Sequence, residues 1–420
     1  MTSPSPANRA AAELRARRAP AALVACCIAS PLLDVVTNVA SYLDRPIGAV
    51  AALKGVILLV LIACLRHSAS KLVVAGFLGI HALRELVIGL QGADIEFTGD
   101  LTYFLRIMTL VCWLLTFHER RADTAFMRTT LRVFETVAMT SALAGVLGFV
   151  LHLDFFKAYA DERNGYKGLF FAENDTSIFY LVALVWGIAR PRTAGGWYLP
   201  SVIAGIAMLG LGSKTALAGL LLVPALFLLF RERSRGRSAA ILRGLLLYVL
   251  APVAATWIGI EFESLIDAIG YDQLVRVLNE SGLFSALLSY RDLKVGALLA
   301  SIGSPIDLLF GLNIRHPYGI FGPETSGQHM IEIDLFDYLF RVGALGIGLT
   351  AWTLLHTTAF SRWRRSGREF KVFATMILIT GLTVGHVLLS AMNAIWIAFF
   401  FVLCSGLHAQ ARKPCPAATR

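Results

Sequence analysis

The stretch "GQHMIEIDLFDYLFRVGALG" (residues 327–346) places three carboxylates and an arginine where a long apolar run begins. The carboxylates are Glu332, Asp334 and Asp337, and the arginine is Arg341. Ionised side chains are costly in lipid, and inside membranes they face a bundle interior or a water-filled cavity. The stretch therefore predicts a membrane helix whose first turns border a watery space instead of lipid.

The whole chain has the composition of a polytopic membrane protein. Of its 420 residues, 56% are hydrophobic and only 16% are charged, and the mean hydropathy is +0.67, whereas a soluble domain has about 25% charged residues. Windows of about 17–22 residues, each able to cross about 30 Å of hydrocarbon, predict about twelve spanning helices. They cover residues 21–40, 47–65, 71–90, 99–117, 130–151, 173–190, 197–211, 213–230, 240–259, 334–357, 371–389 and 391–409. Because 197–211 is short, the pair at 197–230 could instead form one re-entrant unit. These runs do not alternate apolar and polar residues as barrel strands do, so the predicted class is all-α.

Lys and Arg gather in alternate connecting segments. With the N-terminus inside, the inner segments include "RARR" (15–18), "RERSRGR" (231–237) and "RWRRSGREFK" (362–371). The positive-inside rule then predicts a multi-pass protein with both termini in the cytoplasm. The first apolar run contains Asp34 and Asn38, and we interpret it as helix one instead of a cleaved signal peptide. The formal net charge of +10 follows from topology, so no nucleic-acid partner is expected.

The predicted helices divide the chain into five parts. These are a cytoplasmic N-terminal segment (1–20), helices 1–9 (21–259), a large outer loop (260–333), helices 10–12 (334–409) and a cytoplasmic tail (410–420). Within the large loop, "SYRDLKVGALLASIG" (289–303) has the apolar spacing of a helix. The six cysteines show no metal-ligand spacing, so we expect no metal site and no cofactor. The chain has no internal repeat, which weakens the interpretation as an inverted-repeat transporter.

Further charges lie inside the predicted helices, mostly in their outer halves. Arg84, Arg106 and Arg341 lie about five to seven residues from the outer boundary, down to about 10 Å deep at the helical rise. Each could belong to a local pair, such as His81 with Glu85, but their common depth favours a polar chamber that opens outward. Its cations suit a phosphate or pyrophosphate. Because the chain has no nucleotide-binding motif, energy would come from a gradient or from an activated lipid-linked donor.

Four stretches, in this order, resemble the bacterial O-antigen ligase/polymerase family, which includes exopolysaccharide polymerases. They are "KGLFFAEND" (167–175), "GLGSKTALAGLLL" (210–222), "SYRDLKVGALLASIGSPIDLLFGLN" (289–313) and "EIDLFDYLFRVGALGIGL" (332–349). The resemblance covers roughly residues 165–350, with Lys214 where the family commonly has Arg and Asp175 where small residues are frequent. Ligases commonly carry a His near the position of Glu332 and Asp334, so the resemblance favours a polymerase.

The resemblance implies a GT-C-like architecture and a metal-independent, inverting glycosyl transfer at the periplasmic face of the bacterial cytoplasmic (inner) membrane. The implied donor is a glycan repeat unit on polyprenyl (undecaprenyl) pyrophosphate, and the acceptor is another lipid-linked repeat unit. Membrane lipids and a chain-length regulator protein are further expected partners. Two alternatives stay open. One is a ligase of the same family with a lipid or protein acceptor, and the other is a secondary transporter or lipid flippase.

The candidate site combines a base with several cations. Glu332 or Asp334 would accept the proton of the attacking hydroxyl, and Arg291 would clamp the pyrophosphate with its guanidinium fork. The expected substrate-binding residues are Arg84, Arg106, Arg163, Lys167, Asn174, Lys214, Arg315, His316, His329 and Arg341. The alternatives are that the carboxylates and Asn174 cap helices and that Lys214 snorkels to the interface.

Overall fold

The computed structural model describes most of the chain as helix. It covers residues 6–45, 48–90, 97–158, 165–189, 198–230, 291–300, 302–312, 331, 333–383, 385 and 387–411. Within these ranges no strand is formed, and one isolated antiparallel bridge joins Lys157 to Tyr166. The all-α prediction is confirmed for the part of the chain that the structure describes.

The helices follow the apolar windows of the sequence. They are α1 (Pro6–Tyr42), α2 (Ala49–Cys64), α3 (Ser68–Leu90), α4 (Phe97–Arg120), α5 (Thr124–Leu151), α6 (Glu173–Ala189), α7 (Tyr198–Leu211), α8 (Lys214–Leu229), α12 (Arg291–Ala300), α13 (Pro305–Phe310), α15 (Asp334–Thr357), α16 (Arg368–Thr383) and α17 (Ala391–Ala411). Two short 3-10 helices, η1 (Asp154–Phe156) and η3 (Ala359–Arg365), lie between them. The predicted window 240–259 lies outside the described residues.

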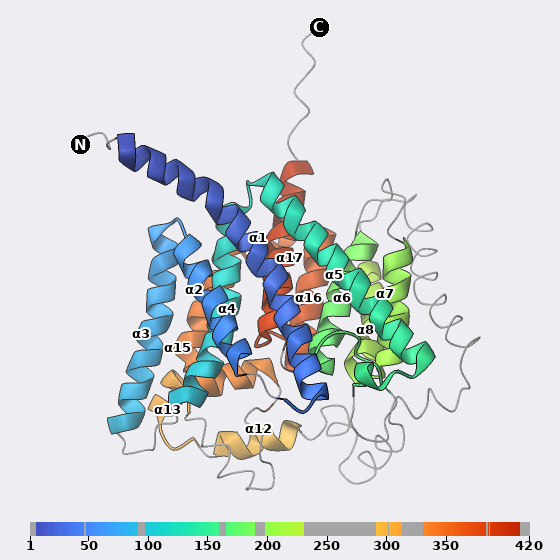
Figure 1. Cartoon of the computed structure of the whole chain (residues 1–420). Helices are drawn as coiled ribbons and strands as arrows, with labels where there is room; N and C mark the ends of the chain where they lie inside the picture. The colour runs from blue at the N-terminus through green and yellow to red at the C-terminus, as the bar shows by residue number, and fades with distance from the viewer. Residues whose placement is uncertain are drawn as a thin grey trace.

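The long helices run side by side and have two distinct ends (Figure 1). At one end α1 begins and α17 ends, and we call this end the terminal face. At the opposite end α12 lies across the bundle with α13 beside it, and we call this end the loop face. α1 therefore begins and α17 ends on the same side of the bundle. Which side of a membrane each face meets remains a prediction from the basic segments.

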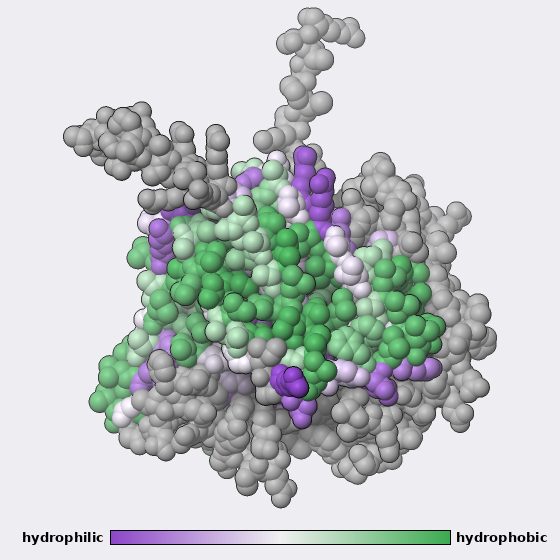
Figure 2. Space-filling model, viewed as in Figure 1, coloured by the Kyte–Doolittle hydropathy of each residue, from purple (hydrophilic) through white to green (hydrophobic). Residues whose placement is uncertain are grey.

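Five of the described helical stretches are long and apolar enough to cross a membrane. They are Ala19–Tyr42, Ser68–Leu90, Leu101–Arg120, Thr124–Leu151 and Asp334–Thr357. Large apolar side chains also face outward, including Leu72 and Leu90, the latter 78% exposed. Figure 2 shows such residues across the middle of one face, with hydrophilic residues toward its two ends. An exposed apolar band of this kind is what lipid covers, so the chain is a membrane-associated helical protein.

The core is organised around α17, which is apolar on all sides. Residues 394–402 of α17 are all buried, and the helix packs most extensively against α4. Small side chains such as Ala394 and Ala398 allow close helix approach, which drives packing where lipid is as apolar as the protein. Around them, Phe134 contacts Trp396 and Phe400 at ring centroid distances of 5.2 and 4.7 Å. A helix without a polar face can only occupy the centre of a bundle or face lipid.

Two helix boundaries depart from the apolar pattern. α15 matches the predicted window 334–357, but its backbone is not helical at Gly343, where φ is 62° and ψ is −174°. The first arm, 334–342, therefore lies before a break at the loop face and not within one straight spanning helix. The predicted window 371–389 is wrong at its end, because α16 stops at Thr383 and Gly385 has a φ of 68°. Positive φ ends a helix and is readily adopted by glycine, a property that hydropathy does not register.

Candidate functional site

Those sequence-predicted site charges that the structure describes lie at or near the loop face. α2, α4, α6 and α8 begin there, as does α15, while α1, α3 and α16 end there (Figure 1). The described candidates form three groups. The first surrounds the loop before α6, the second surrounds Tyr103, and the third connects the first arm of α15 to its neighbours.

The loop before α6 is held by polar residues of α1. The Asp34 carboxylate is buried, and its Oδ2 accepts a hydrogen bond from the Phe171 backbone N–H at 3.0 Å. Lys54 Nζ lies 3.8 Å from Asp34 Oδ1, so a cation from α2 neutralises this charge. One helical turn further on, Asn38 Nδ2 donates to the Leu169 carbonyl at 3.3 Å. These contacts give Asp34 and Asn38, two polar residues of α1, a structural role.

Lys167 is a half-buried cation in this loop. Its Nζ lies 5.4 Å from the centroid of the Phe171 ring, within cation–π range. Burial lowers the pKa of Lys167 below its usual value, and the charges of Glu173 and Asp34 oppose that shift. Asn174 is half-buried and is the second residue of α6, so it lies inside the first turn and does not occupy the N-cap position.

Lys214 is the first residue of α8, as predicted, and its side chain is exposed. Ser213 caps this helix, since its Oγ accepts from the Ala216 N–H at 3.1 Å. The same Oγ lies 2.6 Å from Ser177 Oγ of α6, which ties the two helix starts together. An exposed lysine at a helix N-terminus combines a full positive charge with the partial charge of the helix dipole, so the position favours an anion.

Two arginines meet at the ring of Tyr103 near the start of α4. The guanidinium carbon of Arg106 lies 5.0 Å from the ring centroid, and that of Arg341 lies 4.8 Å from it. Arg106 is exposed, whereas Arg341 is buried at 6% exposure. The negative ring face of a tyrosine attracts both cations and so offsets part of their mutual repulsion. Sequence reasoning did not select Tyr103, although it lies three residues before Arg106 and so on the same face of the helix.

Arg84 is placed differently from Arg106. It is buried at 2% exposure, lies 2.6 Å from Glu85 Oε1 and donates to the Leu312 carbonyl. His81 Nδ1 lies 3.5 Å from the same carboxylate oxygen, so the predicted local pair of His81 with Glu85 is present. Arg84 thereby connects α3 to the segment after α13. Its role in substrate binding stays a prediction.

The segment Gly311–Leu312 closes against the first arm of α15. The Leu312 N–H donates to the Phe340 carbonyl at 2.6 Å. Gly311 has a φ of 89°, and a Cβ there would come within 2.7 Å of the same carbonyl oxygen. Arg291 Nη1 donates to the Thr383 carbonyl at 3.2 Å and so attaches α12 to the end of α16. The predicted helix within 289–303 is confirmed over Arg291–Ala300.

The carboxylates of the first arm are both buried at 2% exposure. Asp337 Oδ1 accepts from the Ile331 N–H at 2.8 Å, and Asp334 Oδ2 accepts from the Leu388 N–H at 2.8 Å. Asp337 thus holds the segment that precedes α15, while Asp334 holds the turn between α16 and α17. A buried carboxylate that accepts a backbone hydrogen bond stabilises that connection. Whether Asp334 also acts as a base stays a prediction.

The remaining predicted site residues lie outside the described residues. These are Arg163, Arg315, His316, His329 and Glu332. Among the residues that are described, no group of three or more His, Cys, Asp and Glu could hold a metal ion. Asn393 is a buried polar residue that sequence reasoning missed, and its Nδ2 donates to the Asp175 carbonyl at 3.1 Å. Its position in a nearly uniform apolar run is the signal that could have identified it.

Comparison with known proteins adds no family assignment. The chain matches no protein-family model, no curated protein and no solved structure.

Proposed function

We propose that the protein is a polysaccharide polymerase that joins lipid-linked glycan repeat units at its loop face. The observation that supports this best is the pair of guanidinium groups on Tyr103, one exposed and one buried, at one end of an apolar helix bundle. Arginines hold phosphate oxygens through paired hydrogen bonds. Exposed Lys214 lies at the start of α8 and half-buried Lys167 lies in the loop before α6, and both supply further positive charge.

The chemistry that these groups would support is a single displacement. The acceptor hydroxyl oxygen attacks the anomeric carbon of the donor, the bond from that carbon to the pyrophosphate breaks, and polyprenyl pyrophosphate leaves with inversion at the carbon. The leaving group gains negative charge as the bond breaks, and fixed cations stabilise this charge. Arg291, Arg106 and Arg341 are the residues we assign to the pyrophosphate.

The proton of the acceptor hydroxyl needs a base in hydrogen-bonding reach. Asp334 is nearly inaccessible and already accepts a hydrogen bond from Leu388. We therefore assign the proton to Glu332 and give Asp334 the role of a positioning residue. It would act by holding the turn between α16 and α17 against the first arm of α15.

The decisive experiment incubates purified protein in liposomes with synthetic undecaprenyl-pyrophosphate repeat units and separates the products by size. A ladder of lipid-linked oligomers is expected. The variant Arg106→Gln should lose most of the ladder, while Arg128→Gln should keep it, because Arg128 is an exposed arginine at the terminal face. A single transfer to a foreign lipid or protein acceptor would identify a ligase. Movement of the intact donor across the bilayer without any transfer would identify a transporter.

A further inference from the structure

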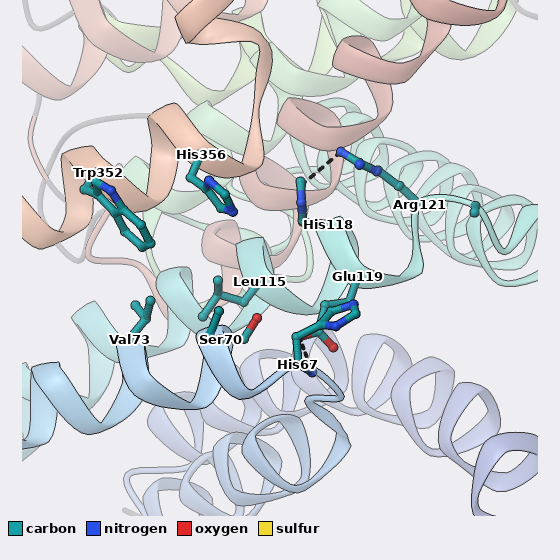
Figure 3. Close-up of a pocket in the computed structure, with 11 residues that line it drawn as sticks. His67, Ser70, Val73, Leu115, His118, Glu119, Arg121, Trp352 and His356 are labelled. Atoms are coloured by element: carbon teal, nitrogen blue, oxygen red, sulfur yellow. Dashed lines mark hydrogen bonds between the residues drawn. The ribbon is translucent and has the colours of Figure 1, made fainter.

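A separate cavity lies at the terminal face, at the opposite end from the predicted chamber (Figure 3). It is formed where α3 begins and where α4 and α15 end, and its volume is about 230 Å³. Its described polar lining residues come from three places in the chain. They are His67 just before α3 and Ser70 in its first turn, His118 and Glu119 of α4 with Arg121 directly after it, and Trp352 and His356 of α15. None of these residues takes part in the function proposed above.

The size of the cavity limits how large a part of a ligand it can enclose. A water molecule occupies about 30 Å³ in the liquid, so the space corresponds to about eight waters. Pockets for drug-sized ligands measure about 300–1,000 Å³. A phosphate group with part of its ester fits this space, and the rest of a larger ligand would lie outside it.

The charges of the cavity favour an anion. Among the described lining residues Glu119 carries the only carboxylate. Both of its oxygens already accept backbone N–H groups just before α3, from Arg66 at 2.6 Å and His67 at 3.1 Å. Arg121, His67 and His356 can then serve as donors. Neighbouring Arg120 is buried at 3% exposure, and within the described ranges its Nε and Nη1 have no hydrogen-bond partner. A buried guanidinium adds positive potential to this end of α4.

One contact indicates where an anion would bind. His118 Nδ1 lies 2.9 Å from the Thr357 carbonyl and 3.4 Å from Arg121 Nη1. The same nitrogen cannot donate to the carbonyl and accept from the guanidinium. The shorter distance indicates that His118 Nδ1 carries a proton and donates it to the Thr357 carbonyl. The longer contact between His118 and Arg121 (Figure 3) is then weak, and an anion bound to Arg121 would replace it.

The surroundings point to a lipid as the carrier of that anion. Trp352 stacks on His356 with ring centroids 5.2 Å apart, and Trp352 is 47% exposed. Tryptophan at the end of a spanning helix is typical of the membrane interface. α3 and α15 also expose Leu72 and Leu355, which directly precede the cavity-lining residues Val73 and His356. Acyl chains can lie on these exposed apolar surfaces. Basic pockets between helix ends commonly take anionic lipid headgroups.

We propose that this cavity binds the phosphate of an anionic phospholipid headgroup from the leaflet at the terminal face. Arg121 contacts the phosphate oxygens, His118 and His356 line the same space, and the Trp352 ring borders the glycerol region. The cavity lies at the opposite end from the loop face, so this proposal does not depend on the polymerase proposal.

The test is native mass spectrometry of the full-length protein titrated with phosphatidylglycerol and with phosphatidylcholine of the same acyl chains. One phosphatidylglycerol should bind about tenfold more tightly than phosphatidylcholine. Arg121→Gln and His356→Ala should each remove most of this preference, while Arg128→Gln should retain it, since Arg128 is exposed at the same face but does not line the cavity. A second arm adds glycerol 3-phosphate, which should compete only at much higher concentration.

Three outcomes would overturn the proposal. One is an unchanged preference in both Arg121→Gln and His356→Ala. Another is an equal loss in Arg128→Gln, which would mean that general surface charge attracts the lipid. The last is glycerol 3-phosphate binding as tightly as phosphatidylglycerol, which would identify a soluble phosphate ester as the ligand. Both substituted residues are exposed, and an unchanged thermal unfolding midpoint confirms that each variant is folded.

Discussion

Gly343 of α15 packs directly against the backbone of Leu309 in α13. A Cβ at position 343 would overlap the Leu309 carbonyl, and the φ of 62° is unfavourable for any other residue. The break in α15 at Gly343 is therefore also the place where α13 packs against it. Because the break separates 334–342 from the rest of the helix, the charged turn lies at the loop face. That placement explains how an apolar run can open with Asp334, Asp337 and Arg341.

Gly343→Ala should destabilise the protein. Strained backbone of this kind costs about 1–3 kcal/mol before the overlap with Leu309 is counted. We expect a lower thermal unfolding midpoint and loss of polymer, measured on purified protein and with the ladder assay. The matched control is Gly348→Ala on the same helix, where an added Cβ meets nothing within 4 Å. A normal midpoint in Gly343→Ala would show that α13 does not depend on this contact.

Tyr103→Leu should weaken polymerisation while Tyr103→Phe keeps it. Phenylalanine preserves the ring face under Arg106 and Arg341, and leucine removes it. A cation–π contact contributes about 0.5–2 kcal/mol, which corresponds to roughly a 2- to 30-fold effect on rate. The measurement is the initial rate of ladder formation at matched protein levels. Equal rates for Tyr103→Leu and Tyr103→Phe would show that the ring face does not contribute to the reaction.

Glu332→Gln should lower the polymerisation rate by roughly 10²- to 10⁴-fold, the range typical for loss of a general base. Donor binding and membrane accumulation should stay normal, because the amide preserves size. Asp334→Asn serves as the comparison. It should reduce stability more than Glu332→Gln, since Asp334 holds the Leu388 N–H. Full-length polymer at normal rates from Glu332→Gln would refute the assignment of the base.

Cysteine labelling tests the orientation of the two faces. With both termini in the cytoplasm, a membrane-impermeant thiol reagent should label cysteines introduced at 320–328 in intact cells and should not label those at 231–238. The reason is the excess of Lys and Arg in alternate segments. Labelling only at 231–238 would place the loop face in the cytoplasm and exclude a periplasmic reaction.

The helical class and most helix positions were predictable from local sequence. Hydropathy windows identified α15 at 334–357, and Gly212-Ser213 correctly marked the start of α8 at Lys214. Hydropathy and capping act within a few residues, so a linear pattern records them. The end of α16 was missed because Gly385 changes the backbone direction inside an apolar run.

The sequence by itself determined that the chain builds apolar helices and that most of the charges inside those helices lie toward one end. Only the tertiary structure decided which of these charges meet. Arg341 lies over Tyr103, Arg84 reaches the Leu312 carbonyl, and Asp334 accepts from Leu388. The physical reason is distance along the chain. A contact between residues dozens or hundreds of positions apart depends on how helices pack and where glycine lets a helix break, and neither property is written in local hydropathy.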